Sequence, residues 1–252
     1  MRGRAREGRR VPAGLVRARP SGCERPHRTH PPTRWHPVPG RQHRSLGPPA
    51  PRGRPAWEGI MKLLILDRDG TLNRGRDDKV ASPDEWEPLP GALEAVARLN
   101  HGGWRVVLAT NQSGIGRGLF DMASLNAIHL KMHRLLAAAG ARVEAIFICP
   151  HAPEDACGCR KPAPGLFQQI GARFGVPLAE VVAAGNSLRH VQAGAAAGCA
   201  THLLLTGQSA TLGGQPGATI AGLPPATQVH ADLSAFADWL LAQVPPPSKP
   251  TA

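Results

Sequence analysis

The sequence predicts an α/β protein with a Rossmann-like parallel sheet and helices on both faces. From Met61 onward, short apolar runs typical of β-strands alternate with amphipathic stretches typical of helices. Polar or glycine-rich motifs follow several of these runs directly, and open α/β sheets bind their ligands at the carboxyl ends of their strands. The 192 residues from Met61 can build a sizeable core. We therefore expect one domain over residues 61–244, followed by a flexible tail over residues 245–252.

Five apolar runs are the expected strands, at residues 63–66, 105–109, 143–148, 180–184 and 202–205. Apolar residues at helical spacing mark four helices between and after them. These are Leu93, Val96 and Ala97; a stripe from Leu125 through Ile128, Met132, Leu135 and Leu136 to Ala139; Leu166, Ile170 and Phe174; and Leu233, Phe236 and Leu240. Residues 207–229 are rich in glycine and proline and are expected to be a loop.

Residues 1–60 differ sharply from the rest. They hold 14 arginines and three acidic residues, so they carry a formal charge of +11, whereas residues 61–252 carry +1. Without an apolar run longer than two residues, this leader cannot offset its ordering entropy and is expected to be disordered. It fits a nucleic-acid-binding arm or a transit peptide. We favour a third alternative, that the working protein begins at Met61, and then nucleic acid is not an expected partner.

The sequence contains neither a transmembrane segment nor a secretory signal peptide. No run approaches the about 18 apolar residues of a membrane span, and the arginine-rich N-terminus lacks the apolar stretch of an export signal. We expect a cytoplasmic protein that has no membrane partner and is a monomer.

The motif DRDGTLN (residues 67–73) follows the first expected strand. Because side chains alternate along a strand and the next turn can redirect one of them, Asp67 and Asp69 can converge on one point. Such a pair can supply a nucleophile and a proton donor or acceptor, and it can hold a divalent cation. An Asp-Gly turn in a solvated hairpin is the alternative.

The motif TNQSGIGRG (residues 110–118) follows the second expected strand. Its hydroxyl, amides and close-approaching backbone N–H groups suit a phosphoryl group, helped by the N-terminus of the next helix. A flexible connecting loop would look similar.

Three cysteines and a histidine lie within eleven residues after the third expected strand. Cys149, His151, Cys157 and Cys159 have the composition of a closed, structural Cys3His zinc site. A disulfide or unrelated buried thiols are the alternatives, and reducing compartments disfavour the disulfide. Cys23 and Cys199 are expected to be inert.

Arg160 and Lys161 come directly after this cluster, so a bound zinc ion would hold them in place. A guanidinium can bind phosphate through two parallel hydrogen bonds, and an ammonium can stabilise a transferring phosphoryl group. Either residue alone would more often be a surface charge.

Taken together, these motifs and the later segment AAGNSLRHVQAG (residues 183–194) resemble the haloacid-dehalogenase superfamily of phosphatases. Within it, they are most similar to the D,D-heptose 1,7-bisphosphate phosphatases of lipopolysaccharide heptose synthesis. The histidinol phosphatases are near relatives. The resemblance covers residues 62–207, and the stretch SPDEWEPLPGALEAVARL also suits the heptose branch.

The resemblance implies roles for individual residues. Asp67 would form an aspartyl-phosphate, and Asp69 would protonate the leaving sugar oxygen and then activate water. Thr110 and Lys161 would stabilise the phosphoryl group. The implied substrate contacts are Gly75, Arg76, Asp77, Asp78, Asn111, Gln112, Ser113, Arg160, which would recognise a second phosphate, and Ser187.

The resemblance also implies a catalytic Mg2+ held by Asp67, by the backbone carbonyl of Asp69 and by an acidic motif after the fourth strand. In this chain Asn186 and His190 replace the two acids of that motif. The Asn186 amide oxygen can reach a metal but brings no negative charge, and changes even outside the metal's direct ligands cost about 10- to 100-fold. The sequence therefore predicts an intact zinc site, weakened Mg2+ binding and reduced turnover.

Three functions remain open on the sequence. The first is hydrolysis of the 7-phosphate of D-glycero-D-manno-heptose 1,7-bisphosphate. The second is hydrolysis of histidinol phosphate, which uses the same chemistry. The third is a degenerate member that binds a phosphorylated sugar without hydrolysing it, as the residues at 186 and 190 suggest.

Overall fold

The computed structural model describes residues 61–75, 80–212 and 220–243. The leader, with Cys23, and the tail expected from residue 245 lie outside these described residues. The strands are β1 (Leu63–Leu66), β2 (Arg105–Asn111), β3 (Ala145–Cys149), β4 (Val182–Gly185), β5 (Ala200–Leu204) and β6 (Gln228–His230). The helices are α1 (Ala92–His101), α2 (Ser113–Gly116), α3 (Met122–Ala138), α4 (Gly165–Phe174), α5 (Leu188–Ala197) and α6 (Leu233–Ala242).

Within the described residues, six strands form one parallel sheet in the order β3-β2-β1-β4-β5-β6. This confirms the predicted Rossmann-like class. The order reverses direction between β1 and β4, and ligands bind at such a switch point, outside the carboxyl ends of the strands.

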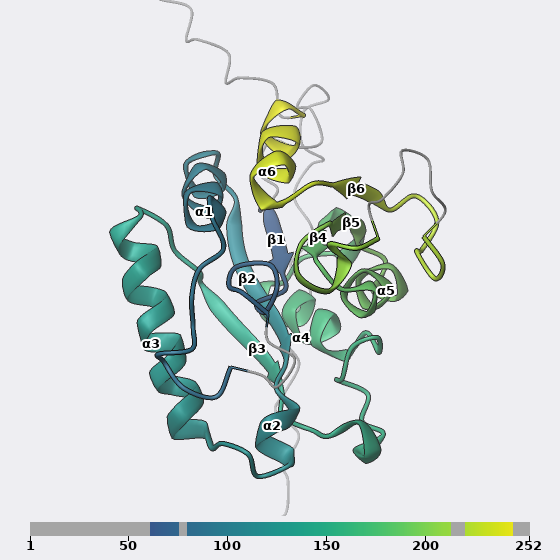
Figure 1. Ribbon diagram of the computed structural model, residues 1–252. Coiled ribbons are helices and arrows are strands. Elements are labelled where there is room, and N and C mark those ends of the chain that lie inside the picture. The colour runs from purple at the N-terminus through teal and green to yellow at the C-terminus, as the bar shows by residue number, and fades with distance from the viewer. Residues whose placement is uncertain (1–60, 76–79, 213–219, 244–252) are drawn as a thin grey trace, which may run out of the picture. The chain divides into compact units, whose positions relative to one another are not determined.

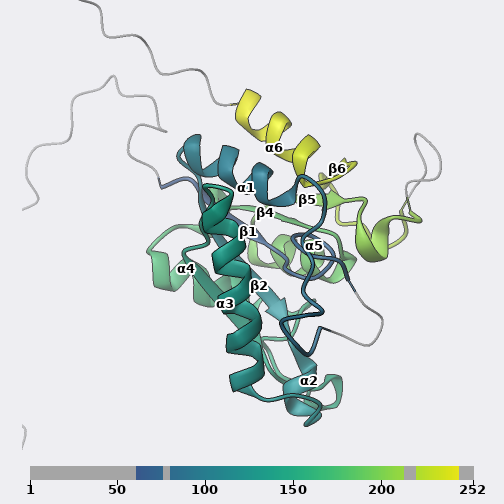
Figure 2. The same cartoon turned by 60° about the vertical axis from the view of Figure 1, so that its left-hand side comes forward.

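Helices cover both faces of the sheet, as the sequence predicts (Figures 1 and 2). Successive side chains of β1 point to opposite faces. Leu64 and Leu66 pack into a core shared with α1, α3 and α6. Leu63 and Ile65 pack into the other core, which includes Phe167 of α4 and part of α5.

Several expectations about the elements need correction: β2 extends to Asn111, β4 begins at Val182 rather than 180, β5 spans Ala200–Leu204 rather than 202–205, and α2 was not expected. The expected loop 207–229 contains a 3-10 turn at Gly207–Ser209, and its end belongs to β6, a sixth strand that pairs with β5. Strand β3 begins at Ala145 rather than 143, because its ladder with β2 begins there. No helix was expected over the residues of α5. Its buried face is made mainly of small residues and His190, so its apolar pattern is weak.

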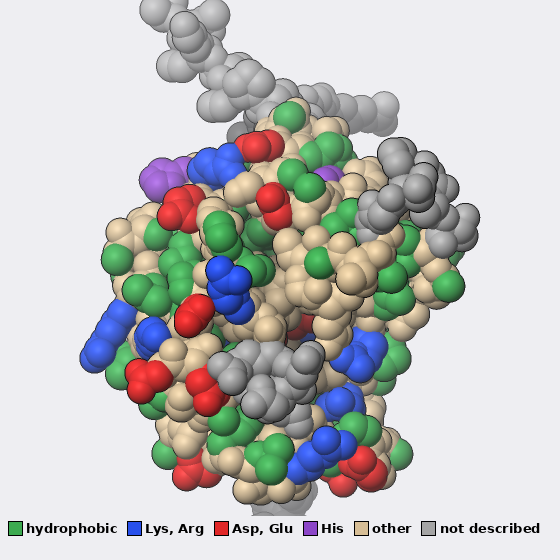
Figure 3. Space-filling model, viewed as in Figure 1, with side chains coloured by type: hydrophobic (Ala, Val, Ile, Leu, Met, Phe, Trp, Pro, Cys, Tyr) green, Lys and Arg blue, Asp and Glu red, His purple; other side chains and the backbone are tan. Residues whose placement is uncertain are grey.

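The described surface carries mixed charge. On the face shown in Figure 3, Lys and Arg side chains are interspersed with Asp and Glu side chains. This distribution agrees with the near-neutral balance of residues 61–252. Within the described residues, no helix has both the length and the apolar character needed to cross a bilayer.

Candidate active site

A cleft of about 440 Å³ opens at the carboxyl ends of β1, β2 and β4, within the usual size range of small-molecule sites. Every described residue predicted to act on or contact the substrate lines this cleft: Asp67, Asp69, Gly75, Thr110, Asn111, Gln112, Ser113, Arg160, Lys161, Asn186 and Ser187. Arg76, Asp77 and Asp78 lie outside the described residues. Arg117, Arg189 and Gln208 also line the cleft, although the sequence analysis did not identify them.

Asp67 follows β1 directly and forms a buried ion pair. Its Oδ1 lies 2.8 Å from the Lys161 Nζ and accepts from the Arg68 backbone N–H at 2.9 Å. The Ser187 hydroxyl donates to Oδ2 at 3.1 Å. Burial by itself raises the pKa of the Asp67 carboxyl, but the Lys161 charge and the hydrogen bonds from Lys161 and the Arg68 backbone outweigh it and hold that pKa below its usual range. Asp67 is therefore an ionised carboxylate at neutral pH.

Asp69 points into the same cleft, and its side chain is 32% exposed. Two amides donate to it: the Asn73 Nδ2 to Oδ1 at 3.0 Å and the Gln112 Nε2 to Oδ2 at 3.0 Å. The same Gln112 nitrogen lies 2.9 Å from the Thr110 Oγ1. Gln112 thus links the carboxylate to the hydroxyl at the end of β2.

Lys161 is fully buried, and its ammonium has three acceptors. Besides Asp67, its Nζ donates to the Ala109 carbonyl at 2.7 Å and to the His190 Nδ1 at 3.1 Å. The Asn111 side chain forms two hydrogen bonds of 3.1 Å with the backbone of Lys161. These contacts direct one positive charge at Asp67.

His190 is neutral in this arrangement, because the nitrogen that accepts from Lys161 cannot also carry a proton. Burial, followed by the Lys161 charge, lowers the pKa of His190 to about 3. From the sequence alone, His190 is visible only as a replacement for an acid. The structure shows that it is a buried hydrogen-bond acceptor for the lysine.

Asn186 follows β4 and lies against the backbone of the first motif. The amide orientation that satisfies its neighbours places Nδ2 2.9 Å from the Asp69 carbonyl oxygen and 3.1 Å from the Thr71 Oγ1. A Cβ atom on Gly70 would lie 2.2 Å from the other terminal atom of this amide, its oxygen in this orientation, and Gly70 has a φ of 79°. Both the close approach and the left-handed backbone therefore require glycine there.

Two sets of donor atoms in the described structure could bind a metal ion. The first is the Asp67 carboxylate, the Asp69 carbonyl and the Asn186 amide at the cleft. For all three to face one cation, the Asn186 amide must turn its oxygen toward the Asp69 carbonyl and break the bonds described above. This set supplies one charged ligand, which is already paired with Lys161, so it fits a weakly held Mg2+.

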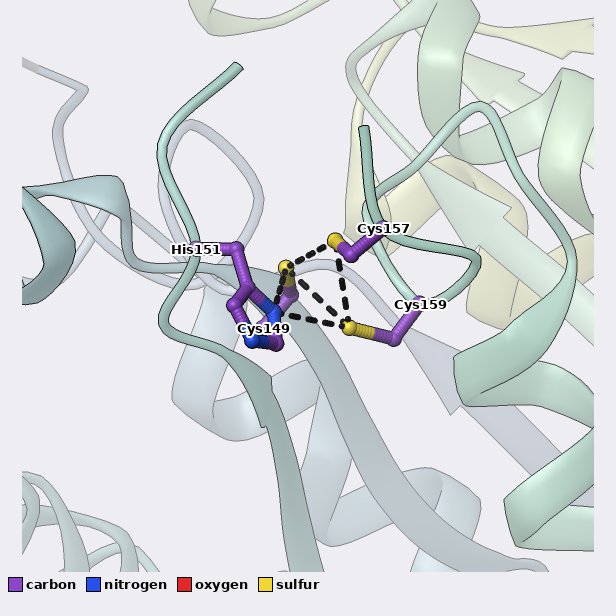
Figure 4. Close-up of side chains that lie close together, drawn as sticks. All are labelled: Cys149, His151, Cys157 and Cys159. Carbon is purple, nitrogen blue, oxygen red and sulfur yellow. Dashed lines mark hydrogen bonds between the residues drawn. The ribbon is translucent and has the colours of Figure 1, made fainter. Parts of the chain in front are cut away.

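The second group is Cys149, His151, Cys157 and Cys159, which converge beyond the end of β3 (Figure 4). All four donor atoms lie within 4.8 Å of one another. The sulfurs of the three cysteines are 3.4 to 3.6 Å apart, and the His151 Nδ1 is 3.2 Å from the Cys159 Sγ. In a tetrahedral site with Zn–S bonds of about 2.3 Å, the sulfurs would be about 3.8 Å apart.

This cluster holds the segment that carries the two predicted phosphate-binding residues. The thiols of Cys149, Cys157 and Cys159 are free, which argues against a disulfide among them. Arg160 follows the last cysteine, and its guanidinium donates to the His151 carbonyl at 3.3 Å. Cys199, also a free thiol, is buried elsewhere.

Comparisons with known proteins match this chain to hydrolases. The sequence model of the haloacid dehalogenase-like hydrolases matches residues 73–198. The chain is 56% identical to the D-glycero-beta-D-manno-heptose-1,7-bisphosphate 7-phosphatase of Bordetella bronchiseptica over 73% of this chain and 99% of that protein. It is 45% identical to the enzyme of that name from Pseudomonas aeruginosa, over 71% and 97% of the two chains.

The fold has a similar counterpart among solved structures. The crystal structure of the B. bronchiseptica D,D-heptose 1,7-bisphosphate phosphatase, complexed with magnesium and phosphate, matches with a TM-score of 0.68 and 55% identity. The match covers 73% of this chain and all of that one.

Proposed function

The chain belongs to the haloacid dehalogenase-like hydrolases, and we propose that it removes the 7-phosphate from D-glycero-β-D-manno-heptose 1,7-bisphosphate. Such an activity supplies heptose precursors for lipopolysaccharide. The observation that carries this proposal is the convergence of Asp67, Asp69, Thr110 and Lys161 in one cleft beside Arg160. A cytoplasmic location and a monomeric state stay predictions of the sequence.

In the proposed reaction, an oxygen of the Asp67 carboxylate attacks phosphorus while the bond from phosphorus to the sugar oxygen breaks. In this step Asp69 acts as the protonated carboxylic acid and gives its proton to that leaving oxygen. Asp69 then takes a proton from water, whose oxygen attacks the aspartyl-phosphate, and this step releases phosphate and restores Asp67. Thr110 and Lys161 bind the phosphoryl oxygens, and Arg160 binds the phosphate that remains at position 1.

We assign Mg2+ to Asp67, the Asp69 carbonyl and Asn186, and zinc to Cys149, His151, Cys157 and Cys159. When bound, Mg2+ offsets negative charge on the phosphoryl oxygens. Zinc would be structural, because its four protein ligands leave no open position. The remaining proposed substrate contacts are Gly75, Arg76, Asp77, Asp78, Asn111, Gln112, Ser113 and Ser187. Asn111 and Ser187 also position Lys161 and Asp67 through the hydrogen bonds described above.

Phosphate release from the heptose bisphosphate, measured across a Mg2+ titration, tests this proposal. We expect release of one phosphate per sugar, with the 1-phosphate retained in the product, and much slower release from histidinol phosphate. Binding of the bisphosphate without release at saturating Mg2+ would instead identify a non-hydrolytic binding protein.

A further inference from the structure

The Asp69 carboxylate is held by an arginine that is itself held from a distant helix. Arg68 is fully buried. Its Nε donates to the Asp69 Oδ1 at 3.1 Å, and its Nη2 lies 3.0 Å from Oδ1 and 2.9 Å from Oδ2. The remaining guanidinium nitrogen, Nη1, lies 3.1 Å from the Nε2 of His129. Both ends of the guanidinium are therefore engaged.

His129 lies half-buried on α3, 61 residues from Arg68 in the sequence. A guanidinium has donors only, so the Nε2 of His129 must accept and the ring proton must be on Nδ1. Burial, followed by the Arg68 charge, lowers the pKa of His129 to about 4, which agrees with a neutral ring. His129 does not line the cleft, and Arg68 is the residue that hydrogen-bonds to both His129 and Asp69.

This chain of contacts limits how the carboxylate can move. A buried guanidinium bound only at its Asp69 end could tilt, and the carboxylate would tilt with it. Bound at both ends, Arg68 fixes the plane of the Asp69 carboxylate, and the amides of Asn73 and Gln112 add a donor to each oxygen. Proton transfer depends steeply on such placement.

We propose that His129 is a positioning residue that, through Arg68, places the Asp69 carboxylate at the leaving oxygen. This inference rests on the proposed function, in which Asp69 gives the proton to that oxygen. A sugar alkoxide needs this proton in order to leave, whereas p-nitrophenolate leaves without one. The effect of His129 must therefore depend on the leaving group.

The test compares His129→Ala and His129→Gln by kcat/KM for the heptose bisphosphate and for p-nitrophenyl phosphate. This ratio reports the steps up to departure of the leaving group. For the sugar phosphate, His129→Ala should lower kcat/KM about 10-fold or more, because a misplaced catalytic group costs rate steeply. For p-nitrophenyl phosphate the loss in kcat/KM should be much smaller. His129→Gln should retain most activity, because its Oε1 can accept from Arg68. His133→Ala, at an exposed histidine one turn along α3, is the matched control and should match the unmodified chain.

Equal losses for the two substrates, or a His129→Gln variant as impaired as His129→Ala, would overturn the proposal. The nitrogen NMR spectrum of the His129 ring supplies a readout that needs no turnover. We expect the proton on Nδ1, and a proton on Nε2 would exclude the bond to Arg68. If the unmodified chain releases phosphate from neither substrate, the proposed function has failed, while the NMR result still decides whether His129 holds Arg68.

Discussion

Asn186 sets the charge available to a cation at the cleft. Its side chain lies beside the Asp69 carbonyl and Thr71, where an acid would supply a second charged ligand. The Asp67 carboxylate is the one charged ligand in the proposed Mg2+ set, and it already pairs with Lys161 at 2.8 Å. We therefore expect a neutral amide at this position to bind a cation more weakly than an acid of similar shape would.

Replacing this amide by an acid should restore cation binding. We expect Asn186→Asp to raise Mg2+ affinity about 10-fold or more, because it adds a negative charge directly at the metal. Titration calorimetry with Mg2+ alone measures this without turnover. Asn126→Asp, at an exposed position of α3, controls for the change in net charge and should leave the affinity unchanged. Equal Mg2+ affinity in Asn186→Asp and the unmodified chain would contradict the assignment.

Residues that act through other side chains were the hardest to identify from the sequence. The motif DRDGTLN identified Asp67 and Asp69 because both follow one strand. His129 lies in an amphipathic helix whose apolar stripe accounted for the segment, so its polar role was missed. His190 was interpreted only through the acid it replaces, and its hydrogen bond to Lys161 joins residues 29 apart.

Among the elements, the end of β3 and the loop after it contain the cluster of three cysteines and one histidine. Cys149 and His151 lie at its start and Cys157 and Cys159 near its end. The cluster therefore links the end of β3 to the segment that carries Arg160 and Lys161.

Removing one donor of this cluster should release the loop. We expect Cys157→Ser to lose zinc, measured by elemental mass spectrometry, and to lower phosphatase turnover at least about 10-fold, because Lys161 lies only four residues beyond. Cys199→Ser is the matched control, since Cys199 is a free thiol outside the cluster. This variant should retain both its zinc and its phosphatase turnover. A Cys157→Ser protein that retains one zinc per chain would refute this role.

The junction of β5, β6 and α6 contains two neighbouring histidines whose rings are tilted to each other. His202 on β5 lies 3.0 Å from His230 on β6 and packs against Phe236 and Trp239 of α6. Burial, followed by the His230 charge, lowers the pKa of His202 to about 4. In an unfolded chain, the pKa of a histidine is about 6.5.

Stability should therefore fall in acid. Below about pH 6.5 the unfolded chain binds a proton at His202, whereas the folded chain binds it only at about pH 4. The free energy of unfolding therefore falls as the pH drops through this window, and this contribution of His202 is complete above it. In urea unfolding at several pH values, His202→Gln should show a shallower pH dependence than the unmodified chain. His101→Gln, at an exposed histidine of α1, should show the same pH dependence as the unmodified chain. An unchanged slope in His202→Gln would exclude this cause.

At the scale of the whole molecule, the strand order brings the site together. Asp67 and Asn186 follow β1 and β4, the neighbouring strands between which the order reverses, and Thr110 lies in β2 on the other side of β1. Every described residue of the cleft comes after Leu66. The described residues of the cleft therefore all come from the nearly neutral part of the chain, residues 61–252.

Residues 61–252 alone should therefore behave as the full chain does. We expect the same melting temperature and the same kcat/KM for the heptose bisphosphate, because the described cleft and both cores lie within this part. Side-by-side assays of the two chains measure this. A large loss in the shorter chain would assign residues 1–60 a working role and reopen the nucleic-acid alternative.

The sequence by itself determined the class of fold, four of the helices, the approximate place of five strands and the motifs at their ends. These follow from local patterns: alternation of apolar residues, helical spacing, and polar residues placed directly after strands. It did not identify β6, because three residues are too few to show a pattern, or α5, because small residues give a weak apolar stripe. Only the tertiary structure decided that His190 accepts from Lys161, that Asn186 donates to the Asp69 carbonyl, and that His129 holds Arg68. Each of these contacts joins segments far apart in the chain, and their geometry exists only once the sheet and helices have packed.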